Sequence, residues 1–238
     1  MNLSGCWIAR SRVLLLCMLA GLVAGIALWK PVRVLAEEAA GDVSFRWAFV
    51  TKPAGEENAQ PEVVAEDAVL KTGDRLKILV EPQSGCYVYV VYHSAQDELK
   101  MLFSYDEQKM DSGDSEPRMH FIPQGDAWFR LDENVGRETF FLLASAERLT
   151  TIEDLFRQYE SSAGDAGSQI GKQILLEIED RLKQHRDLSS PAERPVPIGG
   201  AIRSIDSREA SSAEEIASLG REVTAKGFYG RVFTIEHK

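Results

Sequence analysis

The chain has 238 residues, 44% of them hydrophobic, and 27 Lys and Arg stand against 37 Asp and Glu, for a net charge of −10. An acidic surface of this kind repels nucleic acid and anionic lipid headgroups, which argues against nucleic-acid-binding proteins as a class. The length is typical of one domain with an appendage, and the apolar fraction is sufficient for a hydrophobic core.

The first 36 residues have the layout of a secretory signal peptide. Arg10 and Arg12 precede an uncharged apolar run at 13–29, and Val34-Leu35-Ala36 provides small residues ahead of a cleavage site. We therefore expect cleavage after Ala36 and a periplasmic or otherwise extracytoplasmic protein. The alternative is that residues 13–29 stay uncleaved as an inner-membrane anchor, with the rest of the chain outside the cytoplasm.

Charge and cysteine content change once this segment is removed. Residues 1–36 contain four of the 27 basic residues and no acid, so 23 basic and 37 acidic residues remain, a net charge of −14. Cys6 and Cys17 leave with the signal, and Cys86 alone cannot form an internal disulfide. Its place in an apolar strand favours a small buried residue over a catalytic thiol.

Alternation of apolar and polar residues predicts β-strands from residue 43 onward. Val43, Phe45, Trp47 and Phe49 form the first such pattern. Further strands are expected at 75–81, 86–92, 99–103, 119–122, 127–131 and 138–144. The segment 86–92 is apolar on both faces, which is typical of a central strand. No helix-length segment interrupts the strands before residue 150, so we expect a mainly β, antiparallel β-sandwich-like domain over 37–148.

Helical periodicity begins at Thr150. Thr150 and Glu153 fit a capping box, and a second helix is expected from Ser168 to about Leu188. The apolar stripe of this second helix either docks a partner or covers the sheet. We therefore expect a two-helix addition over 149–188.

The last part of the chain is expected to be a linker followed by a strand. Residues 189–227 are predicted to be a linker with one or two helical turns near 213–219, because three prolines at its start cannot continue a helix. Residues 228–238 are predicted to form a C-terminal strand that returns to the sheet, since a terminal strand is held only by pairing.

A set of short motifs follows in a fixed order between Val69 and Arg148. The motifs are Thr72-Gly73-Asp74-Arg75-Leu76, Gly85-Cys86-Tyr87-Val88-Tyr89-Val90, Leu102-Phe103, Ile122-Pro123, Gly136-Arg137-Glu138 and Leu143-Ala144-Ser145. The ordered set resembles the bacterial domain of unknown function 4384, although Ser104 stands where that family has proline. The resemblance implies an extracytoplasmic or envelope-linked accessory domain, and it brings no known catalytic residues.

Motifs for common catalytic and cofactor sites are missing from the sequence. It has no G-x-S-x-G, H-E-x-x-H or paired-cysteine motif, and the glycines at 167–172 lack the spacing of a phosphate loop. We therefore expect no catalytic residue, cofactor or metal. The acidic loop 106–116 is favoured as a solvated loop, with calcium binding as the alternative.

The most favoured function is that of an exported, non-catalytic accessory or interaction domain that binds a protein partner in the cell envelope. Tyr87, Tyr89 and Trp128 are the candidate ligand or partner surface, although aromatic stripes are most often core. With a deep apolar pocket beside them, the same three residues would instead indicate a small-ligand sensor.

The second function class considered is a hydrolase of an envelope polymer. Asp74, Asp132 and Glu138 are its candidate acids, and this interpretation requires two of them to face each other across a groove.

Overall fold

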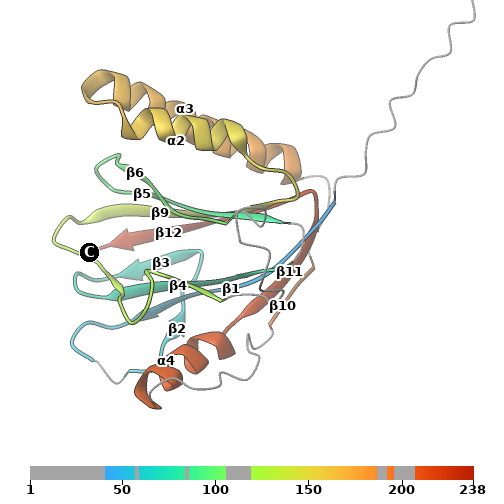
Figure 1. Ribbon diagram of the computed structural model, residues 1–238. Coiled ribbons are helices and arrows are strands. Elements are labelled where there is room, and N and C mark those ends of the chain that lie inside the picture. The colour runs from blue at the N-terminus through green and yellow to red at the C-terminus, as the bar shows by residue number, and fades with distance from the viewer. Residues whose placement is uncertain (1–40, 57–58, 84–85, 106–118, 187–191, 196–206) are drawn as a thin grey trace, which may run out of the picture. The chain divides into compact units, whose positions relative to one another are not determined.

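The computed structural model describes residues 41–56, 59–83, 86–105, 119–186, 192–195 and 207–238. All of them belong to one compact unit, in which two β-sheets pack face to face with helices outside each sheet (Figure 1). The predicted signal peptide, the apolar run 13–29 and the acidic loop 106–116 lie outside the described residues. Within the described ranges, no helix is long and apolar enough to cross a membrane.

The first sheet, sheet A, is antiparallel throughout. Its strands in spatial order are β10 (Ala192–Pro195), β11 (Arg221–Lys226), β1 (Asp42–Lys52), β4 (Arg75–Pro82) and β7 (His120–Ile122), with β2 (Glu62–Val63) on β1 and β8 (Phe129–Arg130) on β4. The strand predicted at 127–131 is thus only the short β8, which follows a turn.

The second sheet, sheet B, contains the C-terminal strand. Its order is β3 (Asp67–Leu70), β12 (Phe228–His237), β9 (Gly136–Ser145), β5 (Tyr87–His93) and β6 (Leu99–Tyr105), and only β3 and β12 run parallel. The predicted return of the C-terminal strand is confirmed, because β12 pairs with β9 along its whole length. β5 lies between β9 and β6, as its apolar character predicts.

The main core lies between the two sheets. Trp47 and Phe49 of β1 both contact Phe233 of β12, with ring centroids 5.4 and 5.0 Å apart. These rings point inward because alternate residues of a strand share one face, as the sequence pattern predicts. Cys86 is 1% exposed, and its thiol lies 3.2 Å from the carbonyl oxygen of Ser44, so it is a small buried residue.

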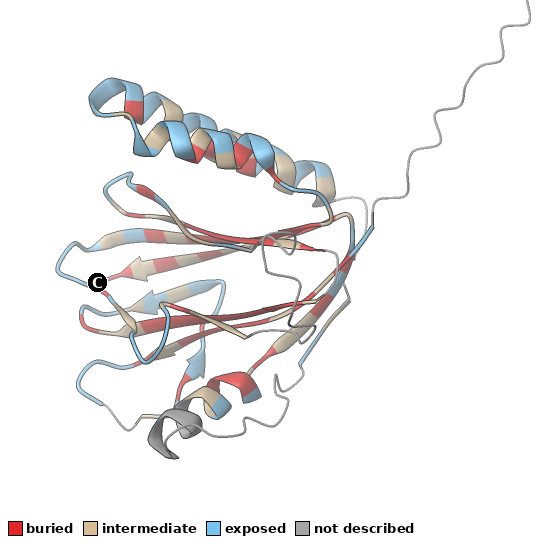
Figure 2. Ribbon diagram, viewed as in Figure 1, coloured by how far each residue is buried: buried red, intermediate tan, exposed pale blue. Residues whose placement is uncertain are grey.

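Two helices cover the outer face of sheet B. The helix α2 (Thr150–Glu160) and the helix α3 (Gly164–Arg186) form an outer layer whose buried side faces the sheet (Figure 2). Ile174 and Ile178 are fully buried there, so the apolar stripe of α3 covers the sheet. The glycines at 167–172 lie inside α3 rather than in a phosphate-binding loop.

The predicted capping box at Thr150 is wrong. Leu149 is the N-cap residue of α2, and no side chain caps the helix. Thr150 is already helical, so its hydroxyl is not at the capping position. Glu153 instead receives hydrogen bonds from Tyr89 and Arg148.

The predicted linker at 189–227 is also wrong for the residues that the structure describes there. β11 pairs with β1 from Asp42 to Trp47 and buries Val223 and Ala225 between the sheets. The helix α4 (Ser207–Ser218) begins before the turns predicted at 213–219 and buries Ile216 against the outer face of sheet A. The sequence pattern does not reveal β11 because it is a short strand between Gly220 and Gly227, and its pairing partner β1 lies far away in the sequence.

Candidate functional site

The structure separates the three aromatic residues that the sequence suggests as a binding surface. Tyr89 is 1% exposed beneath α2 on the outer face of sheet B, and Tyr87 is partly buried in the same cluster. Trp128 packs near Phe121 on the outer face of sheet A. Because the two outer faces lie on opposite sides of the sandwich, the three rings do not form one platform.

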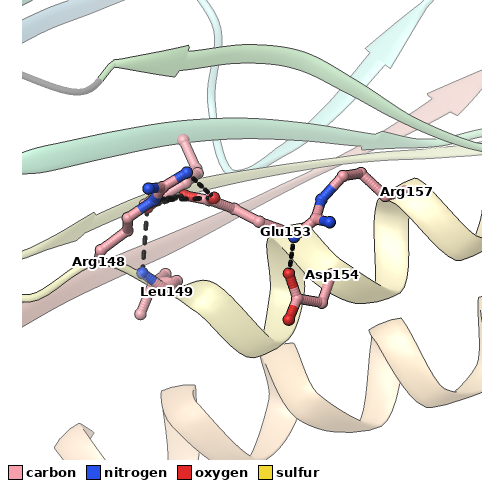
Figure 3. A network of polar contacts seen from close by, with 6 residues as sticks. Arg148, Leu149, Glu153, Asp154 and Arg157 are labelled. Atoms are coloured by element: carbon pink, nitrogen blue, oxygen red, sulfur yellow. Dashed lines mark hydrogen bonds and ion pairs between the residues drawn. The ribbon is translucent and has the colours of Figure 1, made fainter. Parts of the chain in front are cut away.

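Tyr89 connects the sheet to the first turn of α2. Its hydroxyl donates to Glu153 Oε1 at 2.9 Å and accepts the N–H of Leu149 at 3.1 Å. Arg148 donates to both oxygens of the same carboxylate at 2.5–2.9 Å (Figure 3). Burial raises the pKa of Tyr89, and its bond to Glu153 adds to the rise. These contacts fix the start of the helix on the sheet.

Two of the three candidate acids, Asp74 and Asp132, stabilise turns through hydrogen bonds. Asp74 accepts the N–H groups of Ala54 and Lys71, both at 2.9 Å. Asp132 accepts the backbone and side-chain N–H groups of Asn134, both at 2.8 Å, and these bonds lower its pKa. Both carboxylates stabilise local backbone, as short acidic side chains commonly do in turns.

The third candidate acid, Glu138, is 3% exposed between the two sheets. The Tyr92 hydroxyl donates to Glu138 Oε2 at 2.5 Å. Burial is the main cause that raises the pKa of Tyr92, and the hydrogen bond to this carboxylate adds to the rise. At the same end of the sandwich, the His237 ring lies 3.1 Å from Thr72 Oγ1 and 3.0 Å from the carbonyl oxygen of Asn134. The contacts of the three acids give the hydrolase interpretation no support.

Two glycines of the sequence motifs are required by the backbone at this end. Gly73 has φ +92°, and a Cβ there would lie 3.0 Å from the Cβ of Ala54. Gly136 has φ +143°, and a Cβ would lie 2.6 Å from the Cβ of Ala95. The Gly-Asp-Arg and Gly-x-Glu motifs therefore supply turns and a buried hydrogen bond.

A cleft opens between the β5–β6 turn and the α2–α3 turn, with a volume of about 630 Å³. Leu99 and Tyr159 connect its two sides, because the N–H of Leu99 donates to the Tyr159 hydroxyl at 3.2 Å. Gly171 of α3 lies beside this contact, and a Cβ there would be in ordinary van der Waals contact with both side chains. Ser94 stabilises the β5–β6 turn by accepting the N–H groups of Gln96 and Glu98.

Acidic side chains outnumber basic ones at the walls of the cleft. Asp97, Glu98 and Glu160 are exposed there, opposite Lys172, and Asp97 lies 3.3 Å from His93 Nε2. Neither Glu98 nor Glu160 forms an ion pair with any residue that the structure describes. The first turn of α3 also lines the cleft, and such turns leave backbone N–H groups without intrahelical partners. The cleft therefore offers carboxylate acceptors beside backbone donors.

Sequence reasoning missed this cleft. Its residues come from a polar turn at 93–99 and a small-residue connection at 160–168, and each segment alone has the composition of an ordinary loop. The turn signals locate both loops, but only the packing of α2 and α3 on sheet B brings them together.

Comparison with known proteins identifies one family. Residues 69–148 match the family model described as a domain of unknown function (DUF4384), which confirms the resemblance seen in the sequence motifs. No curated protein and no solved structure matches the chain. The matched segment includes the β5–β6 turn and ends before α2, so the cleft is formed partly by the matched segment and partly by the helices after it.

Proposed function

We propose that the protein is an exported, non-catalytic accessory domain of the bacterial cell envelope that binds a segment of a partner protein in the cleft. The observation that carries this proposal is the cleft itself. Its volume of about 630 Å³ is in the range of ligand-binding pockets, and its walls come from the β5–β6 turn on one side and from the α2–α3 turn with the first turns of α3 on the other.

The chemistry of the walls favours a polypeptide with basic side chains. An extended peptide carries backbone carbonyl groups that can accept from the first turn of α3. Its Lys or Arg side chains would meet Glu98 and Glu160, whose carboxylates form no ion pair with described residues. The acidic net charge of −10 would also attract a basic partner before contact.

The location in the envelope is supported by the sequence of the first 36 residues and by the implication of the family resemblance. Fractionation and N-terminal sequencing test this part separately. We expect the mature chain outside the inner membrane with Glu37 as its first residue, or the intact chain anchored in that membrane. Recovery of the intact chain among soluble cytoplasmic proteins would contradict export.

Site-specific photo-crosslinking in intact cells of the source organism tests the cleft. A photoreactive residue at Lys172, inside the cleft, should crosslink to one envelope protein in stoichiometric yield. The same residue at Glu147, exposed near the opposite end of α2, is the matched control and should give no such product.

Charge reversal identifies the contact. We expect the double variant Glu98→Lys/Glu160→Lys to abolish the crosslink at position 172, because the lysines at both positions would repel a basic segment. Glu147→Lys changes an exposed acid away from the cleft and should leave the yield unchanged. Equal crosslinking from positions 172 and 147, or a yield that is insensitive to the double reversal, would contradict the proposal.

A further inference from the structure

Four basic side chains lie together on the outer face of sheet A. Lys52 of β1 is directly opposite Arg75 of β4, and Arg75 is directly opposite Arg130 of β8. Residues paired across antiparallel strands point to the same face of a sheet. Lys77 is two residues further along β4, so it points to this face as well.

None of these four residues forms an ion pair with a carboxylate that the structure describes, although acids outnumber bases in the chain. Many other basic residues are paired: Arg46, Arg137, Arg148, Arg157, Arg181, Lys183, Arg194, Arg221 and Arg231. Asp126 attracts Lys77 from the neighbouring turn without forming an ion pair with it. The four residues therefore form a local positive patch on an acidic protein.

Lys52 is buried at 8% exposure, and Lys77 is the most deeply buried member of this basic patch, at 3% exposure. Its ammonium donates to the carbonyl oxygens of Gly125 and Ala127, and lies 5.2 Å from the Phe121 ring centroid and 5.5 Å from that of Trp128. Carbonyl dipoles and aromatic faces stabilise a cation here without neutralising its charge.

The other three members have charged groups that no described carboxylate neutralises. Lys52 Nζ lies 5.4 Å from the Trp128 ring centroid and makes no hydrogen bond or ion pair with any described residue. Arg75 donates one guanidinium N–H to the carbonyl oxygen of Glu56, while its Nε is buried and has no acceptor in the described part of the chain. Arg130 is exposed to solvent.

We propose that the basic patch formed by Lys52, Arg75, Lys77 and Arg130 binds a phosphate group. Guanidinium and ammonium groups are the side chains that recognise phosphate oxygens, and several cations without carboxylate partners suit an anion with more than one charge. The net charge of −10 opposes the approach of a long polyanion or an anionic membrane, so we expect a compact phosphate-bearing molecule, with a lipid headgroup as the other source of phosphate that the test separates. This site is independent of the cleft, which lies on the outer side of sheet B.

Titration calorimetry of the full chain with pyrophosphate at low ionic strength tests the proposal. Arg130→Gln and Lys52→Gln should each weaken binding by about 10-fold, the usual effect of losing a charge-assisted hydrogen bond. Arg130 is exposed, so its variant is informative even if the replacement of Lys52 impairs folding. Lys100→Gln, an exposed lysine of β6 in sheet B, is the matched control and should bind like the wild type.

Sedimentation with phosphatidylglycerol vesicles distinguishes the two sources of phosphate. Pyrophosphate binding that the two variants weaken would identify a soluble ligand. Vesicle binding that Arg130→Gln and Lys52→Gln weaken, without pyrophosphate binding, would identify a lipid headgroup. Either of these two outcomes would support a phosphate site. Absence of both kinds of binding, or binding that Lys100→Gln weakens as much as Arg130→Gln, would overturn the proposal.

Discussion

The outer faces of the two sheets have opposite chemistry. On sheet B, apolar side chains such as Val91 and Leu143 are buried beneath α2 and α3. On sheet A, Ala48 and Leu79 pack with α4, but Lys52, Lys77 and Glu81 are buried on the same face. Buried charge contributes little to stability compared with apolar contact. The comparison therefore indicates that the covered part of the sheet B face stabilises the fold and leaves binding to the cleft at its edge, whereas the sheet A face itself retains charged groups suited to binding.

The largest expected effect concerns the helical layer on sheet B. Ile178→Ala should lower the free energy of unfolding by about 3 kcal/mol, because Ile178 is fully buried and its removal leaves a cavity. Leu176 lies on the same helix at 58% exposure, so Leu176→Ala should cost less than about 0.5 kcal/mol. Urea unfolding measures both, and equal losses would show that α3 does not contribute to the core.

The next effect concerns the charged face of sheet A. Glu81 is 7% exposed at its side chain and lies 3.3 Å from Arg46, so Glu81→Gln should cost about 1 to 2 kcal/mol, because Arg46 then keeps only its longer pair with Glu222 at 3.6 Å. The matched control is Glu236→Gln, whose exposed pair with Arg137 should contribute less than about 0.5 kcal/mol. Similar small losses in both variants would show that the buried pair is energetically no different from a surface pair.

A smaller effect is expected where sheet B meets α2. Tyr89→Phe should cost about 1 to 2 kcal/mol, because the N–H of Leu149 and the carboxylate of Glu153 both lose a partner. Tyr87→Phe is the control, since Tyr87 packs in the same cluster without a hydrogen bond to a described residue. Chemical denaturation compares the two, and a loss in Tyr87→Phe as large as that in Tyr89→Phe would contradict the role of the hydroxyl.

The smallest effect is a pH dependence at the end of α3. His185 stacks on Phe228 with ring centroids 4.7 Å apart, and burial, helped by Arg181, lowers its pKa. The unfolded chain then binds the proton more tightly than the folded one, so stability should fall as the pH decreases from about 7 to about 5. Urea unfolding of His185→Asn at the two pH values should show a weaker dependence, whereas an unchanged dependence would exclude His185 as its source.

Alternation and helical periodicity predict much of the fold. The faces of β1 and β5, and the existence of α2 and α3, follow from the order of apolar residues. β3 and β11 were missed because they are short and are stabilised by β12 and β1, which lie far away in the sequence. The sites were missed for the same reason. The cleft requires two distant turns to meet, and the basic patch becomes visible only once the register places Lys52 opposite Arg75.

The most direct test of the division between the two faces is one nuclear magnetic resonance experiment on the isotope-labelled full chain, with pyrophosphate and a Lys/Arg-rich peptide titrated separately. Pyrophosphate should shift the amide signals of Lys52, Arg75 and Arg130 and the indole signal of Trp128. The peptide should instead shift the amides of Glu98 and Lys172. If both ligands perturb the same residues, or neither perturbs its predicted set, the two faces do not have the separate binding roles proposed for them.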